Sequence, residues 1–133
     1  MTYPATFRYS EQHQWVDVKG DRGTIGLTDY AQSQLNEIVS VDLPKPGAIL
    51  EAGKPLGSVE SVKAVNEIDA PVSGEVVGVN AALKNAPEKV NSDPHGRGWL
   101  VKVRLKNAAE VDALMDAGTY EAYVAVPHNE AAG

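Results

Sequence analysis

The stretch that decides the fold is Leu56-Gly57-Ser58-Val59-Glu60-Ser61-Val62-Lys63-Ala64-Val65-Asn66-Glu67-Ile68-Asp69. Its two ends, 56–60 and 65–69, have the apolar and β-branched residues of extended segments. They flank 61–64, and a gap of that length predicts a β-hairpin with a four-residue tip. We therefore expect Lys63 to lie on a tight turn between two antiparallel strands.

Short strands and turn residues continue on both sides of this hairpin. Alternating residues on either side of the turn at 20–23 predict a second hairpin, and 38–43 and 75–79 predict two more strands. The clearest strand runs through 99–105, where apolar and charged positions alternate. Between them, 91–98 is so rich in turn formers that we expect a surface loop without regular structure.

Helices are predicted at one internal position and at the end of the chain. Thr28 is a suitable N-cap for a short helix through Leu35. Asn107 is a second candidate cap for a helix that would end near Gly118, and Thr119 would begin a last helix to about residue 126. The fold class is thus mainly β, a sandwich or barrel with a short internal helix and C-terminal helices.

The size and charge of the chain restrict its function. A length of 133 residues predicts a single domain over 1–133, with a core of about 7–126 and a flexible tail at 127–133. The net charge of −6, without a cluster of Lys or Arg, argues against nucleic acid and anionic membranes as partners. No apolar run approaches the ~20 residues of a membrane span, and no signal peptide is visible, so we expect a cytoplasmic protein.

The sequence offers no motif for catalysis or for metal binding. A resemblance to a phosphate loop around Gly47 and Gly53 fails, because the glycines are one residue too far apart and Pro55 replaces the Ser or Thr. The absence of cysteine excludes thiolate chemistry, so any sulfur must come from a cofactor. No metal-ligand spacing joins the three histidines, His13, His95 and His128.

Lys63 is then the one residue whose position suggests a chemical role. A lysine on a hairpin tip is accessible to a modifying enzyme, and a group attached there could reach several partners. A turn lysine is also an ordinary solubilising charge. Spacing alone leaves both interpretations open.

A resemblance adds what spacing does not. Several motifs are similar to the H protein of the glycine cleavage system, in that family's order and spacing: Glu-Ser-Val-Lys-Ala at 60–64, Pro-Val-Ser-Gly-Glu-Val at 71–76, Asn-Ser-Asp-Pro at 91–94, Gly-Trp-Leu at 98–100 and His-x-Trp at 13–15. The resemblance covers about residues 7–126. Gly74, which follows Lys63 by eleven positions (74 − 63), is a feature shared with lipoyl domains in general.

This resemblance implies a fold, a cofactor and partners. The fold would be a barrel-sandwich hybrid of two antiparallel sheets, with lipoic acid attached covalently to Lys63. The chain would be a non-catalytic carrier, and its partners would be four enzymes: glycine decarboxylase, an aminomethyltransferase, dihydrolipoyl dehydrogenase and a lipoate-attaching enzyme. It would act as a monomer in glycine catabolism.

The sequence departs from the family at two places, the segment 64–69 that follows Lys63 and residue 14. Gln14 stands where the family usually has glutamate, which removes a carboxylate that could pair with a cationic aminomethyl group. Glu67 matches an acidic position of the family, so we expect it to provide the remaining negative charge near the arm.

Two alternatives remain from the sequence. A lipoyl domain of a 2-oxoacid dehydrogenase or a biotinyl carrier shares the hairpin lysine, but biotinyl domains have methionines where this chain has Val62 and Ala64, and neither kind has an extension like 107–126. An H-like protein that relays lipoate or regulates, without taking part in glycine cleavage, has the same sequence signature.

Overall fold

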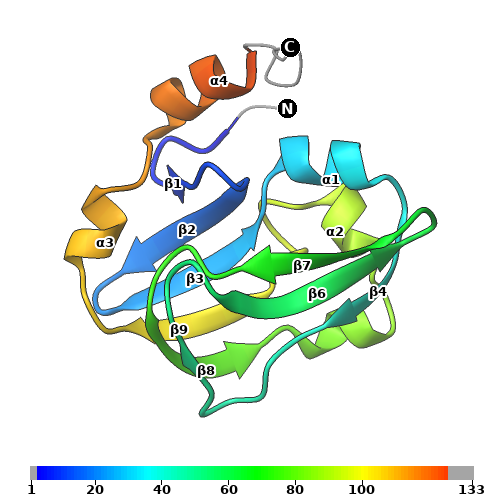
Figure 1. The fold of residues 1–133 in the computed structure, drawn as a ribbon, viewed down its shortest axis with the longest axis horizontal. Helices are drawn as coiled ribbons and strands as arrows, with labels where there is room; N and C mark the ends of the chain where they lie inside the picture. Colours follow the sequence, from blue (N-terminus) through cyan, green and yellow to red (C-terminus); the bar gives the residue numbers. More distant parts are fainter. Residues whose placement is uncertain (1–2, 126–133) are drawn as a thin grey trace.

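The computed structural model describes residues 3–125 and consists mainly of short strands (Figure 1). The strands are β1 Arg8–Tyr9, β2 Gln14–Lys19, β3 Arg22–Leu27, β4 Ile38–Asp42, β5 Ile49–Leu50, β6 Pro55–Ser61, β7 Val65–Asp69, β8 Gly74–Val79 and β9 Val101–Leu105. The helices are α1 Asp29–Leu35, the 3₁₀ helix η1 Ala81–Lys84, α2 Lys89–Ser92, α3 Ala109–Asp112 and α4 Ala117–Ala125.

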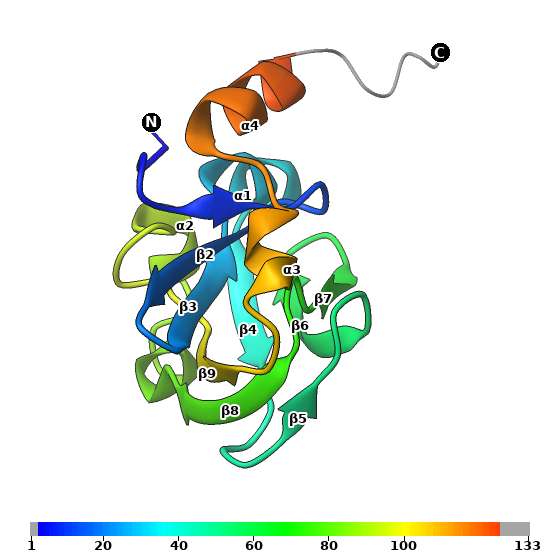
Figure 2. The same ribbon diagram turned by 90° about the vertical axis from the view of Figure 1, so that its left-hand side faces the viewer.

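The strands form two antiparallel sheets. The larger has the order β1-β2-β3-β9-β8-β5, and the smaller has the order β4-β6-β7. The sheets face each other without closing into a barrel, and the helices lie around their edges (Figure 2). The prediction of a mainly β fold with two antiparallel sheets and a few short helices is confirmed.

Alternating burial explains why the strands form where they do. In β9, Val101 and Val103 are buried whereas Lys102 and Arg104 are exposed, as expected of a strand with one face on the core. The residue type at position 26 is decided by the close approach of a ring. A Cβ on Gly26 of β3 would lie 2.6 Å from the indole of Trp15 on β2. Glycine is therefore needed where this ring crosses the strand.

Two apolar clusters hold the molecule together. The larger lies between the sheets and takes residues from both, among them Val16, Ile25, Val59, Ile68 and Val103. The smaller is an aromatic cluster between the N-terminal segment and α4, which consists of Phe7, Tyr9, Trp15 and Tyr120. The first cluster joins the two sheets, and the second joins the N-terminal segment to α4.

Helix α1 begins as the sequence predicts. Thr28 is its N-cap, and the Oγ1 atom of Thr28 accepts a hydrogen bond from the backbone N–H of Ala31 at 3.1 Å. Helix α1 ends at Leu35, which is the predicted end. No helix among residues 3–125 is long and apolar enough to cross a membrane.

The predicted helix from 107 to 118 is present only over the short α3, and the rest of the prediction is wrong. Helix α3 ends at Asp112, and the chain then becomes extended so that Met115 and Tyr9 exchange two backbone hydrogen bonds of 2.8 Å. Helix α4 starts at Ala117, where Asp116 accepts the backbone N–H of Thr119 at 2.8 Å. Pairing with a distant strand has overridden a helical pattern, and the expected terminator at 118 lies inside α4.

The predicted loop at 91–98 is also partly wrong. Its first two residues belong to α2, and Pro94 and Gly98 are buried. The indole N–H of Trp15 donates a hydrogen bond of 2.9 Å to the carbonyl oxygen of Pro94, which draws the segment into the fold. The predicted end of the last helix at 126 and the predicted tail at 127–133 lie outside the described residues.

Candidate functional site

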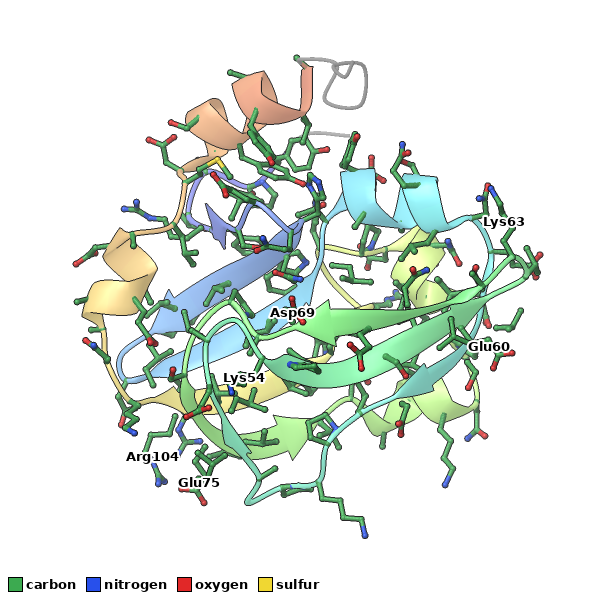
Figure 3. The ribbon with its side chains drawn as sticks, in the orientation of Figure 1. Lys54, Glu60, Lys63, Asp69, Glu75 and Arg104 are labelled. Carbon is green, nitrogen blue, oxygen red and sulfur yellow. The ribbon has the colours of Figure 1, made fainter. Side chains whose placement is uncertain are left out.

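The hairpin of β6 and β7 projects from the body of the molecule, and Lys63 lies at its tip (Figures 1 and 3). The two strands pair in antiparallel register up to Glu60 and Val65. The turn that follows contains Val62, Lys63 and Ala64, so the structure places Lys63 where the sequence predicts it. The side chain of Lys63 is exposed.

Ser61 fixes the backbone of this turn. Its Oγ atom accepts the backbone N–H groups of Lys63 and Ala64, each at 3.2 Å. Its own backbone N–H donates to the carbonyl oxygen of Ala64 at 2.8 Å. Since Ser61 is only 6% exposed, these bonds are sheltered from water and the turn is anchored to the sheet.

A second contact braces the tip from the neighbouring strand. The backbone N–H of Val62 donates a hydrogen bond of 3.0 Å to the carbonyl oxygen of Glu37, directly before β4. The Lys63 amine, in contrast, makes no hydrogen bond or ion pair within residues 3–125. The site therefore combines a held backbone with an accessible primary amine, which in its neutral form is a nucleophile that can be acylated.

A groove of about 190 Å³ lies along β7 on the way back from the tip to the body. Its apolar walls are formed by Leu27, Ala31, Leu35, Val59 and Ile68. Glu67 also lines it, four residues beyond Lys63, a stretch that would span at most about 14 Å if fully extended. The groove can accept a slender apolar group with a charged end, because a carboxylate stands beside apolar walls.

The structure separates the two residues that the sequence associates with the arm. Gln14 is 3% exposed, and its amide oxygen accepts a hydrogen bond from the hydroxyl of Ser10. Gln12, His13 and Glu67 line the groove, whereas Gln14 does not. The amide of Gln14 thus serves the interior of the fold, and Glu67 supplies the carboxylate at the groove.

His13 is a groove residue that the sequence reasoning missed. Its Nδ1 atom lies 2.8 Å from the hydroxyl of Tyr120, which in turn lies 2.7 Å from Oγ1 of Thr28. Burial raises the pKa of Tyr120, so the phenol stays protonated and can donate. The two contacts span 107 and 92 positions of the chain, and no local pattern could have revealed them.

Gly74 has a structural reason for being glycine. A Cβ at this position would collide with the backbone carbonyl oxygen of Arg104, because β8 and β9 approach closely there. The glycine that follows Lys63 by eleven positions is therefore required by sheet packing, independently of any recognition by a modifying enzyme.

These features define a class of protein. A β fold that presents one lysine amine on an anchored, projecting hairpin has the construction of a carrier, whose chemistry resides in an attached group. The family model described as glycine cleavage H-protein matches residues 7–126, and the chain belongs to that family. It is thereby a carrier component of the glycine cleavage system.

Individual relatives agree with this assignment. A glycine cleavage system H protein of Acidobacterium capsulatum is 53% identical over 93% of this chain and 95% of its own length. One of Brevibacillus brevis is 52% identical over 93% and 98%. A crystal structure of a glycine cleavage system H protein from Mycobacterium marinum has a TM-score of 0.85 at 34% identity, and the match covers 93% of this chain and all of that chain.

Proposed function

We propose that Lys63 carries lipoic acid in amide linkage and that the chain transports the aminomethyl group of glycine. In this proposal the chain receives the group from glycine decarboxylase, delivers it to an aminomethyltransferase and is reoxidised by dihydrolipoyl dehydrogenase. The observation that carries the proposal is the position of Lys63 on the anchored tip of the β6–β7 hairpin. Family membership supports the cofactor and the system.

The residues present fit a lipoyl group. The amine of Lys63 is accessible, while Ser61 holds the backbone beneath it. When bound, the lipoyl group supplies a disulfide that can be reduced and can accept a carbon unit on sulfur, chemistry that this cysteine-free chain lacks. The tip keeps the attachment point away from the body, so that different enzymes can approach the arm in turn.

The groove gives the chain a second task, which is to shelter the far end of the arm. Its apolar walls exclude water, and the carboxylate of Glu67 lowers the free energy of a positive charge at the groove. At an exposed position this electrostatic contribution is small, about 0.2–1 kcal/mol. Shelter therefore comes mainly from shape, and Glu67 adds a preference for a cationic end.

The remaining features of the proposal concern the chain as a whole. We propose that 1–133 act as one carrier domain, and the larger core supports this because both sheets contribute to it. The protein would have no catalytic residues of its own and would work as a cytoplasmic monomer that docks briefly to each enzyme. A lipoate-attaching enzyme would be its fourth partner.

Glycine–bicarbonate exchange tests the function directly. Glycine decarboxylase would be assayed with the purified chain in two forms, one fully acylated with lipoate and one unmodified. We expect exchange only with the acylated form. Equal exchange with the unmodified form would contradict the proposal, and acylation without any exchange would favour the lipoate relay in place of glycine cleavage.

A further inference from the structure

Large hydrophobic side chains that remain exposed gather around Lys63. The exposed fractions are 44% for Val39, 60% for Val62 and 65% for Val65, and the other large exposed hydrophobic residue among 3–125 is Ile49 on β5, at 67%. Val62 is the neighbour of Lys63 in the turn, and Val65 opens β7. Single exposed valines are ordinary, but three at one end of a small sheet require an explanation.

Val39 belongs to this group because of an irregularity in β4. Ile38 pairs with Ser61 and Ser40 pairs with Glu60, so that Val39 is an extra residue without a partner of its own on β6. An extra residue of this kind is a β-bulge, which bends the strand and redirects a side chain. The bulge breaks the alternation that would otherwise follow buried Ile38, and both Val39 and Ser40 are exposed.

The register of the small sheet places Val65 on the same face as Glu60. Glu60 in the central strand lies opposite Ser40 on one side and opposite Val65 on the other. Residues directly opposite each other in a sheet point to the same face, and Glu60 is exposed. Ser40 and Val65 therefore flank Glu60 on the outer face. Val39, the extra residue beside Ser40, is exposed at the same end of the sheet, and Val62 follows Ser61 in the turn. We name Val39, Val62 and Val65 the valine surface.

Negative charge accompanies the valine surface. Glu37 and Glu60 are both exposed, and within the part of the chain that the structure describes the ion pairs join other residues, Lys54 with Glu51 and Arg104 with Glu75. Two carboxylates without a basic partner stand beside exposed valines. A complementary partner presents an apolar contact area with Lys or Arg side chains at its edge.

The position of the valine surface beside Lys63 favours one of the proposed partner enzymes as its binding partner. An enzyme that acylates Lys63 must bring the lysine amine itself to its reactive centre, so the residues around Lys63 enter the contact. Enzymes that act on the distal end of an attached arm are separated from the tip by the length of that arm. The acylating enzyme consequently has the most to gain from apolar contacts at the tip.

We propose that the valine surface is the docking site for the enzyme that acylates Lys63, and that this enzyme contacts it with apolar side chains edged by cationic ones. The inference rests on the proposed function of Lys63. In the reaction the neutral amine attacks the carboxyl carbon of an activated lipoyl donor, such as an acyl adenylate. A C–N bond forms, the bond to the leaving group breaks with its electron pair, and the amine gives up one proton.

A triple variant tests the docking site. Val39→Thr, Val62→Thr and Val65→Thr together keep β-branching and size but replace an exposed methyl by a hydroxyl at each position, so that folding is expected to persist. Ile49→Thr is the matched control, because it makes a similar change at an equally exposed position on β5. Circular dichroism and thermal unfolding of all proteins would establish that they fold alike.

The measured quantities are kcat and KM for acylation by a lipoate ligase, with the chain as substrate. For the triple variant we expect kcat/KM to fall by roughly tenfold or more, mainly through KM, since the valines do not touch the reacting bond. The control Ile49→Thr should stay within about twofold of the wild type. Raising the salt concentration should lower kcat/KM for the wild type, because Glu37 and Glu60 act through exposed charge.

A second assay uses the same proteins after acylation has been driven to completion. Reduction of the arm by dihydrolipoyl dehydrogenase run in reverse, with NADH as the reductant, should proceed at the same rate in the triple variant and the wild type. An unchanged acylation rate in the triple variant, an equal loss in Ile49→Thr, or an equal loss in the reduction assay would each overturn the proposed docking site. Failure of the wild-type chain to become acylated at Lys63 would instead overturn the proposed function.

Discussion

The tip of the β6–β7 hairpin and helix α4 are built in opposite ways. At the tip the backbone is anchored through Ser61, while Lys63 points into solvent. At α4 the side chain of Tyr120 is fully buried, and its ring stacks on that of Tyr9 at 4.8 Å between ring centroids. One region keeps a side chain accessible, and the other uses a side chain to fasten a helix to the fold.

This difference separates function from stability along the chain. At the tip the backbone and the buried Ser61 hydroxyl hold the turn, so the exposed side chains of Val62 and Lys63 can be chosen for recognition and for chemistry. The contacts of Tyr120 attach α4 to His13, which lines the groove, and to Thr28, which caps α1. A change in one region should therefore leave the property of the other region intact.

The largest expected effect comes from Lys63→Arg. Arginine keeps the positive charge but has no amine that can be acylated, so modification and glycine–bicarbonate exchange should be lost completely. Circular dichroism and the unfolding midpoint should match the wild type, because the side chain is exposed. Lys54→Arg and Lys84→Arg serve as controls that keep both activities. Exchange surviving in pure Lys63→Arg would refute the arm mechanism.

Substitution of Tyr120 should produce the reverse outcome. Tyr120→Ala removes a buried aromatic ring and should lower the free energy of unfolding by about 3–5 kcal/mol. Tyr120→Phe keeps the ring but leaves Thr28 and His13 without this hydroxyl, with an expected loss of about 1–3 kcal/mol. Urea unfolding measures both values. Acylation of the folded fraction should proceed at the wild-type rate, and a slower rate would show that the two regions are coupled.

His95 should make the stability of the fold sensitive to acid. Its Nε2 atom accepts the backbone N–H of Asp29 at 3.1 Å, so this contact requires the neutral ring. Burial lowers the pKa of His95 from its ordinary 6.5, although the carboxylates of Asp29 and Asp93 act in the opposite direction. The folded state therefore binds the proton less readily than the unfolded state, and the stability present above pH 6.5 is lost as the pH falls through the lowered pKa.

The variant His95→Gln isolates this contribution, because glutamine retains an acceptor but does not titrate. The free energy of unfolding, measured by urea at a series of pH values, should decline more steeply for the wild type than for the variant below pH 6.5. Parallel curves would show that His95 does not contribute to the acid sensitivity of the fold.

The smallest expected effect belongs to Glu67→Gln at the groove. Loss of its charge should hasten the decay of chain that carries an aminomethylated arm, by an amount that corresponds to about 0.2–1 kcal/mol. The difference from the wild type should shrink at moderate salt because exposed charges are screened. Glu75→Gln, which removes a negative charge of the same kind from β8, is the control. Equal decay in all three proteins would assign the shelter to shape alone.

Local patterns in the sequence were sufficient to predict the hairpin tip, but not the segments that pair with distant parts of the chain. The strands around Lys63 and the cap at Thr28 follow from alternation and from residue type within a few positions, and both are present in the structure. The extended segment at Met115 depends instead on Tyr9 from the other end of the chain. The bulge at Val39 is set by the register with β6, which no local residue specifies. Long-range pairing thus accounts for the predictions that failed.

The central claim is that Lys63 is the attachment site of the arm, and peptide mapping of the acylated chain tests it most directly. The protein would be co-expressed with a lipoate ligase, its intact mass measured and its peptides sequenced by tandem mass spectrometry. The account predicts one lipoyl group per chain, located on the peptide that contains Lys63. A lipoyl group on Lys54 or Lys84 with unmodified Lys63 would contradict it.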